Sequence, residues 1–215
     1  MAAHTSTQPF ALLNGVVYIL SGFAGLFQRE ACIKYFVSLV TLISTFGLTT
    51  NAIGADPTQD IWTKAMVVPL KNSEAKAVGE AKLLQTPHGV LIRLELSNFA
   101  PGTHAFHIHE IGKCDPPAFT SAGGHFNPFS KKHGILNPEG AHAGDLPNIH
   151  VPKNGTLTVE VLAPQVSLEE GDNKLFDTNG SAFVIHTGPD DYRTDPAGAA
   201  GKRIACGVIA KPAVE

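Results

Sequence analysis

The chain has 215 residues, of which 43% are hydrophobic and 16% are charged, with a formal net charge of −3 and a pI near 6.3. A chain of this length can bury one good core, and its mild acidity leaves no basic field to hold nucleic acid or an anionic membrane. The 21 glycines and 15 prolines favour a turn-rich all-β domain over a helical bundle.

The first 55 residues are expected to form a hydrophobic export segment. Two apolar runs, 10–27 and 31–48, lie on either side of a short charged stretch. The second run has the positive end, the apolar region and the small following residues of a signal peptide, with cleavage after Ala52 or Ala55. We interpret the first run as an over-long gene start, the alternative being half of a two-helix membrane anchor. The mature domain, 56–215, is then periplasmic or otherwise exported and is not embedded in a membrane.

Seven segments beyond residue 60 have the alternation or the composition of β-strands. They are 61–69, 76–85, 89–98, 103–110, 155–163, 181–187 and 203–210. The turn "TPHG" joins the second and third segments as a hairpin, and no segment shows a helical period. We therefore expect an antiparallel sandwich or barrel of about eight strands.

Two connections, 111–154 and 187–202, are too long for simple turns in such a fold. They carry much of the remaining glycine, proline and histidine with little periodicity. Long irregular loops in a compact domain are usually functional or disordered. Because disorder does not require histidines at defined spacings, we expect both loops to be functional.

The stretch "HAFHIHE" contains His107 and His109, which project from the same face if the segment is a strand. An isolated pair of this kind is more often a polar strand face than a metal site. His186 in "FVIHTG" supplies a third imidazole. Three or four imidazoles in a flattened arrangement favour copper over calcium or magnesium, which prefer oxygen.

The first long loop contains three further histidines and an aspartate, namely His125, His133, His142 and Asp145. Three imidazoles and one carboxylate are the ligands of a closed tetrahedral zinc site. Such a site would hold together a loop that has no core of its own.

The expected state of the cysteines follows from the export prediction. Cys32 leaves with the signal segment, so Cys114 and Cys206 remain in the mature domain. Two cysteines in an oxidising compartment most simply form one disulfide. The alternative, two buried free thiols, applies if the chain is not exported.

Four stretches of the sequence together resemble copper/zinc superoxide dismutase of the exported bacterial type. They are "GTHAFHIHEIGKC", "SAGGHFNPFSKKHG", "GAHAGDLPN" and "AGKRIACGVI". They include both signature motifs of that family in order, within about residues 60–210. The resemblance implies a Greek-key fold, one copper and one zinc per chain, and an antioxidant oxidoreductase that converts superoxide to dioxygen and hydrogen peroxide.

The resemblance also implies the two ligand sets, residue by residue. The implied copper ligands are His107, His109, His125 and His186, and the implied zinc ligands are His125, His133, His142 and Asp145. His125 would bridge the metals as an imidazolate and take up a proton as copper alternates between two oxidation states. Arg203 would guide the superoxide anion, and Asp190 would hydrogen-bond ligand imidazoles of both metals.

Two other classes of function rank below the dismutase. A copper-buffering module ranks second. The copper ligands and Arg203 are all retained here, which argues against a module without catalytic activity. A zinc hydrolase ranks third, because the zinc ligand set is complete and Glu110 is expected to face away from His107 and His109. The loop 187–202 lacks the charge-rich guiding sequence of animal relatives, so we expect Arg203 and nearby lysines to attract the substrate. The sequence leaves open whether the protein is a monomer or a homodimer.

Overall fold

The computed structural model describes residues 60–211, so the expected export segment and its boundary at residue 55 lie outside the described residues. Within 60–211 the chain forms nine β-strands and two single-turn 3₁₀ helices, and this range contains no α-helix. A helix long and apolar enough to cross a membrane is likewise not found between residues 60 and 211. The prediction of an all-β fold is confirmed.

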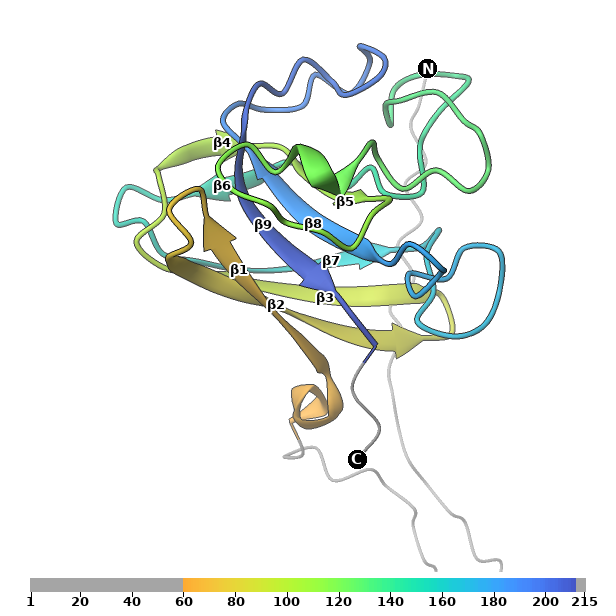
Figure 1. The fold of residues 1–215 in the computed structure, drawn as a ribbon, viewed down its shortest axis with the longest axis horizontal. Coiled ribbons are helices and arrows are strands. Elements are labelled where there is room, and N and C mark those ends of the chain that lie inside the picture. Colours follow the sequence, from red (N-terminus) through yellow and green to blue (C-terminus); the bar gives the residue numbers. More distant parts are fainter. Residues whose placement is uncertain (1–59, 212–215) are drawn as a thin grey trace, which may run out of the picture. The chain divides into compact units, whose positions relative to one another are not determined.

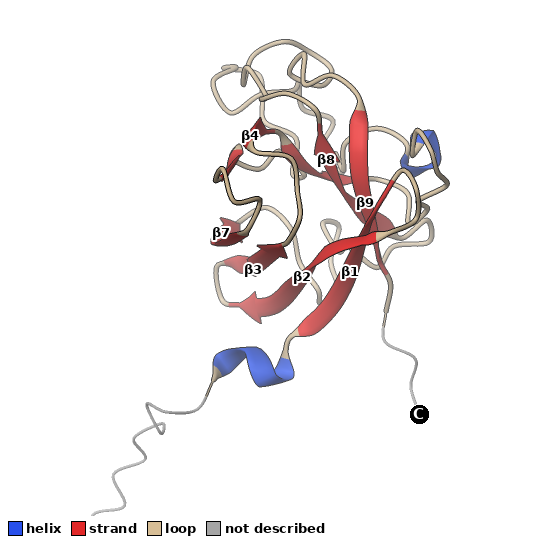
Figure 2. Ribbon diagram, turned by 90° about the vertical axis from the view of Figure 1, so that its left-hand side faces the viewer, coloured by secondary structure: helices blue, strands red, loops and turns tan. Residues whose placement is uncertain are grey.

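Seven of the nine strands form one antiparallel sheet in the order β5-β8-β9-β1-β2-β3-β7, and β4 and β6 form a separate pair. The strands are β1 (Met66–Asn72), β2 (Ala77–Thr86), β3 (Gly89–Leu96), β4 (Gly102–His104), β5 (Phe106–His109), β6 (Ile149–Val151), β7 (Leu157–Ala163), β8 (Ser181–His186) and β9 (Arg203–Ile209). The sheet curls, so that β8 and β9 lie across the core from β2 and β3 (Figures 1 and 2).

The order of the strands shows that the chain crosses between the two sides of the curled sheet. Strand β3 pairs with β7, although β4, β5 and β6 come between them in the sequence. Strand β5 in turn pairs with β8. Such connections between non-consecutive strands are characteristic of the Greek key. They bring β5, which carries two of the expected metal ligands, beside β8, which carries a third.

The core follows from the alternation of apolar residues along the strands. In β3 every second residue is buried: Val90, Ile92, Leu94 and Leu96. In β5 the side chains Phe106 and Ile108 belong to the same core, and Phe106 stacks on Phe183 of β8 with ring centroids 5.1 Å apart. Since neighbouring residues of a strand point to opposite faces, the core fixes His107 and His109 on the other face of β5, under the loops.

Two predicted boundaries were wrong for identifiable reasons. The segment 61–69 is not one strand, because Ile61–Lys64 forms the 3₁₀ helix η1, whose Trp62 N–H is capped by the Asp60 carboxylate at 3.0 Å. The segment 103–110 is interrupted at Ala105, whose N–H donates to Gly188 O at 2.8 Å instead of to a neighbouring strand.

The loop 111–154 contains the short strand β6, which the sequence did not indicate because three alternating residues are too few for a periodic signal. It also contains the second 3₁₀ helix, η2 (Thr120–Ala122). The connection between β7 and β8, residues 164–180, is a third long irregular segment that was not predicted.

Candidate metal centre

The register of the strands places three histidines and an arginine side by side. His107 and His109 lie on β5, which pairs with β8 and so comes close to His186 at the end of β8. A register shift follows Ile185, and His186 is then paired directly with Arg203 of β9. The arginine expected to guide superoxide is therefore a cross-strand neighbour of an expected copper ligand.

The first long loop is held against β5 as an irregular extension of the sheet. Isolated antiparallel bridges pair His107 with Asp145 and His109 with His125. The N–H of Ile108 donates to Gly144 O at 2.9 Å. A side chain at Gly144 would place its Cβ 2.2 Å from the carbonyl oxygen of Ile108, so only glycine permits this approach.

Four imidazole nitrogens converge on one point and have no hydrogen-bond partner. They are His107 Nδ1, His109 Nε2, His125 Nε2 and His186 Nε2. All four lie within 4.8 Å of one another, and all four side chains are buried. In residues 60–211 only one other buried side-chain N or O atom lacks a partner, so the cluster is a specific feature. Four unpaired imidazole lone pairs at one point are suited to a transition-metal ion.

The second nitrogen of each strand histidine in this group is fixed by an acceptor. His107 Nε2 donates to Asp190 Oδ2 at 2.8 Å, and His109 Nδ1 donates to Gly123 O at 3.0 Å. His186 Nδ1 lies 3.3 Å from Gly201 O. These acceptors hold the protons on the outer nitrogens, which leaves the inner nitrogens free as ligands.

A second group surrounds one oxygen of Asp145. The Nδ1 atoms of His125, His133 and His142 lie 2.8, 3.1 and 3.3 Å from Asp145 Oδ1. The edges of a tetrahedral zinc site with ligands at about 2.0 Å are about 3.3 Å long, so this spacing fits a zinc-sized ion. Asp145 Oδ2 accepts the N–H groups of Gly134 and His142, which fixes the carboxylate.

His125 belongs to both groups. Its Nε2 is one of the four unpaired nitrogens, whereas its Nδ1 lies beside Asp145. The two ring nitrogens of His125 are therefore directed at different ligand sets. This imidazole is the only side chain that the two sets share.

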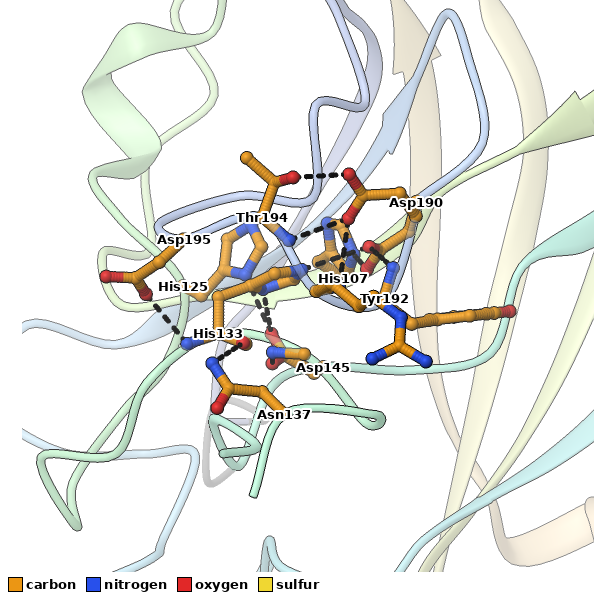
Figure 3. A network of polar contacts seen from close by, with 12 residues as sticks. His107, His125, His133, Asn137, Asp145, Asp190, Tyr192, Thr194 and Asp195 are labelled. Carbon is orange, nitrogen blue, oxygen red and sulfur yellow. Dashed lines mark hydrogen bonds and ion pairs between the residues drawn. The ribbon is translucent and has the colours of Figure 1, made fainter. Parts of the chain in front are cut away.

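Asp190 connects the two groups from outside (Figure 3). Its Oδ2 accepts from His107, and its Oδ1 accepts from His133 Nε2 at 3.0 Å. Asn148 fixes Asp190 by donating to its carbonyl at 2.9 Å and accepting its N–H at 2.8 Å. The sequence did not point to Asn148, because an asparagine in an irregular loop has no distinguishing pattern.

Burial and charge set the protonation of these side chains. Burial lowers the pKa of His125 to about 4 and that of His186 to about 3, so both rings are neutral at pH 7. Burial also acts to lower the pKa of His133, but hydrogen bonds to Asp145 and Asp190 outweigh it and raise the value to about 9. In the absence of a metal His133 therefore carries a proton, which an incoming metal ion would displace.

Arg203 is half-buried and is held by two backbone carbonyls. Its Nη1 donates to Phe119 O and its Nη2 to Gly123 O, both at 2.7 Å. A guanidinium has five N–H donors, so the remaining ones are available to an anion. The predicted disulfide is confirmed: Cys114 and Cys206 are bonded, with Cα atoms 5.7 Å apart, and so tie the segment before Phe119 to strand β9.

An open pocket of about 380 Å³ gives access to the first group of histidines. His109, His125, His186 and Arg203 all line it. Glu110 is among the lining residues as well, and its carboxylate accepts the N–H of Gly124. Strand β5 ends at His109, and the chain bends at Glu110.

The remaining buried histidine, His104, has a structural role. Its Nδ1 and Nε2 lie 2.9 Å from the carbonyl oxygens of His186 and Ala100 respectively. Its ring also packs edge-on against Phe99. With both ring nitrogens engaged, His104 is not available as a metal ligand.

The chain is similar in sequence to known proteins of one family. A family model described as copper/zinc superoxide dismutase (SODC) matches residues 77–209. A copper–zinc superoxide dismutase of Aquifex aeolicus (strain VF5) is 60% identical over 153 residues, which are 70% of this chain and 89% of that protein. A copper–zinc superoxide dismutase of Caulobacter vibrioides is 45% identical over 65% of this chain and 82% of its own length.

A solved structure gives the same result for the fold. The crystal structure of a mutant of a superoxide dismutase-like protein from Bacillus subtilis matches with a TM-score of 0.66 and 45% sequence identity. The match covers 67% of this chain and 97% of that protein. The shared fold, the two histidine groups and the family match together establish that the chain belongs to the copper/zinc superoxide dismutase family.

Proposed function

We propose that the four unpaired histidine nitrogens bind copper and that the group around Asp145 binds zinc. The first set consists of imidazoles alone and opens to a pocket, as a redox ion that meets a substrate requires. The second set adds a carboxylate to three imidazoles and is buried, with only His125 and His142 reaching the pocket, which suits a closed structural zinc site. The enzyme is an oxidoreductase of the superoxide dismutase family, with copper and zinc as its cofactors.

The chemistry divides between the metal and the chain. Copper, when bound, supplies one-electron transfer, oxidising one superoxide to dioxygen and reducing a second to peroxide. His125 Nε2 is the proposed carrier of a proton that ends in hydrogen peroxide. This nitrogen has no hydrogen-bond partner within residues 60–211, and its residue lines the pocket, so it can exchange a proton with a bound oxygen anion.

Arg203 is the proposed binding group for the superoxide anion. Its guanidinium lines the same pocket as His125 and His186, and its two bonds to carbonyl oxygens fix the direction of the fork. A planar, permanently charged donor beside a redox site both attracts a small anion and orients it. Asp190 is the proposed positioning group for His107 and His133.

The shared ring of His125 is the observation that supports this proposal most strongly. It is tested by measuring the copper and zinc content of the purified protein together with the rate of superoxide disappearance. We expect one copper and one zinc per chain, and activity that follows the copper content. His88→Ala, in an exposed turn, is a matched histidine control that should change neither quantity. Full activity without bound copper would contradict the proposal.

We also propose that residues 1–55 direct export and that 56–215 is the mature enzyme of the periplasm or another exported compartment. The Cys114–Cys206 disulfide supports this, because disulfides persist in oxidising compartments. Fractionation of cells followed by N-terminal sequencing of the mature protein tests it. A mature chain that retains residue 10 in the membrane fraction would contradict it.

A further inference from the structure

The side chain of Glu110, at the rim of the pocket, is bonded to a pair of glycines. Its Oε1 accepts the N–H of Gly124 at 2.9 Å. Its own backbone N–H donates to Gly124 O at 3.0 Å. Both the N–H and the C=O of Gly124 are thus hydrogen-bonded to Glu110.

The neighbouring carbonyl, Gly123 O, is shared by two groups of the site. It accepts from His109 Nδ1 at 3.0 Å and from Arg203 Nη2 at 2.7 Å. Its position therefore sets the orientation of an imidazole proposed to bind copper and of the guanidinium proposed to bind superoxide.

Gly123 C=O and Gly124 N–H belong to the same peptide group, which is planar. When the N–H is held, the carbonyl at the other end of the plane is held as well, pointing the opposite way. The carboxylate of Glu110 accepts a hydrogen bond from the N–H end, and His109 and Arg203 donate hydrogen bonds to the carbonyl end.

The packing shows that the carboxylate lies directly against this peptide. Gly123 has a φ of +73°, and a Cβ there would lie 2.9 Å from both Cγ and Oε1 of Glu110. A Cβ at Gly124 would lie 3.4 Å from the same Oε1. Two consecutive glycines leave the space that the Glu110 side chain occupies.

We propose that Glu110 is a positioning residue, whose carboxylate clamps the Gly123–Gly124 peptide and thereby orients both His109 and Arg203. The inference rests on the proposed function in one respect, the roles given to His109 and Arg203. The carboxylate also places a negative charge on the lining of the pocket, which opposes the attraction of an anion. The clamp and the charge have opposite effects on anion binding, so different substitutions separate them.

Three variants make the separation. Glu110→Gln keeps an oxygen acceptor but removes the charge. Glu110→Asp keeps the charge but is one methylene too short to reach Gly124. Glu169→Gln makes the same charge change in the connection between β7 and β8, where the side chain does not line the pocket.

The first measurement is the amide hydrogen exchange of Gly124 in the metal-free protein, which does not depend on activity. Loss of one hydrogen bond predicts roughly fivefold faster exchange in Glu110→Asp, and exchange within about twofold of wild type in Glu110→Gln. Wild-type exchange in Glu110→Asp would overturn the clamp. So would a Glu110→Gln protein that exchanges as fast as Glu110→Asp.

The second measurement is the affinity of the copper- and zinc-loaded protein for azide, followed by its absorption spectrum. We expect roughly fivefold weaker binding in Glu110→Asp. Glu110→Gln should bind azide more tightly than wild type at low ionic strength, with the gain disappearing in salt, while Glu169→Gln stays unchanged. Wild-type affinity in Glu110→Asp, despite faster Gly124 exchange, would overturn the link to Arg203. An Arg203→Ala protein with wild-type azide affinity would instead refute the proposed role of Arg203 and leave the exchange result standing.

Discussion

Replacing His125 with alanine should weaken both metal sites at once, whereas replacing His186 should weaken one. His125 supplies Nε2 to the copper group and Nδ1 to the zinc group, where it lies 2.8 Å from Asp145 Oδ1. His186 supplies an atom to the copper group only. Loss of an outer-shell partner alone costs 10–100-fold in metal affinity, so loss of a direct ligand should raise the zinc dissociation constant at least about 100-fold. In His186→Ala the zinc constant should stay within about twofold of wild type.

Competition with a coloured zinc chelator measures these constants, and a copper chelator does the same for the other site. His88→Ala serves as the control, since that residue is exposed and belongs to neither group. Both His125→Ala and His186→Ala should lose copper affinity. Equal loss of zinc affinity in the two variants would show that His125 is not the shared ligand.

Three further predictions concern the substrate, the disulfide and pH. Arg203→Ala should lower kcat/KM roughly 10–100-fold at unchanged copper content, and should weaken the fall in rate with ionic strength; an unchanged rate would exclude the guiding role. Replacing Cys114 and Cys206 with serine should lower the free energy of unfolding by up to about 4–5 kcal/mol in denaturant titrations, and an unmoved midpoint would contradict this. In the metal-free protein, burial holds the pKa of His125 at about 4 and that of His186 at about 3, below the unfolded value of about 6.5. The stability they contribute is therefore present above about pH 6.5 and lost as the pH falls towards 4, by roughly 3 kcal/mol per histidine; equal stability at pH 7 and pH 4 would refute it.

The ligand residues could be predicted because their chemistry is visible in the sequence. The spacing of His107 and His109 requires only the two-residue period of a strand. The assignment of His125 to both groups came from the family resemblance, because nothing in the spacing of the loop histidines identifies the shared ring. The structure brings all seven side chains together, with the ring nitrogens directed as such sharing requires.

Other features depend on contacts that join distant parts of the chain. At the break at Ala105, the N–H of this residue donates to the carbonyl of Gly188, which lies far away in the sequence. The contact of Glu110 with Gly124 depends on how the first long loop folds back beside the end of β5. Asn148 acquires its role only when the loop carrying Asp190 folds against it. Local patterns carry no information about such pairings.

The most direct test of the shared-histidine centre is a crystal structure of the metal-loaded protein, with anomalous diffraction collected at the copper and zinc edges. One copper peak should lie about 2.0–2.1 Å from His125 Nε2 and one zinc peak about 2.0–2.1 Å from His125 Nδ1. A structure in which either metal makes no contact with this ring would contradict the account.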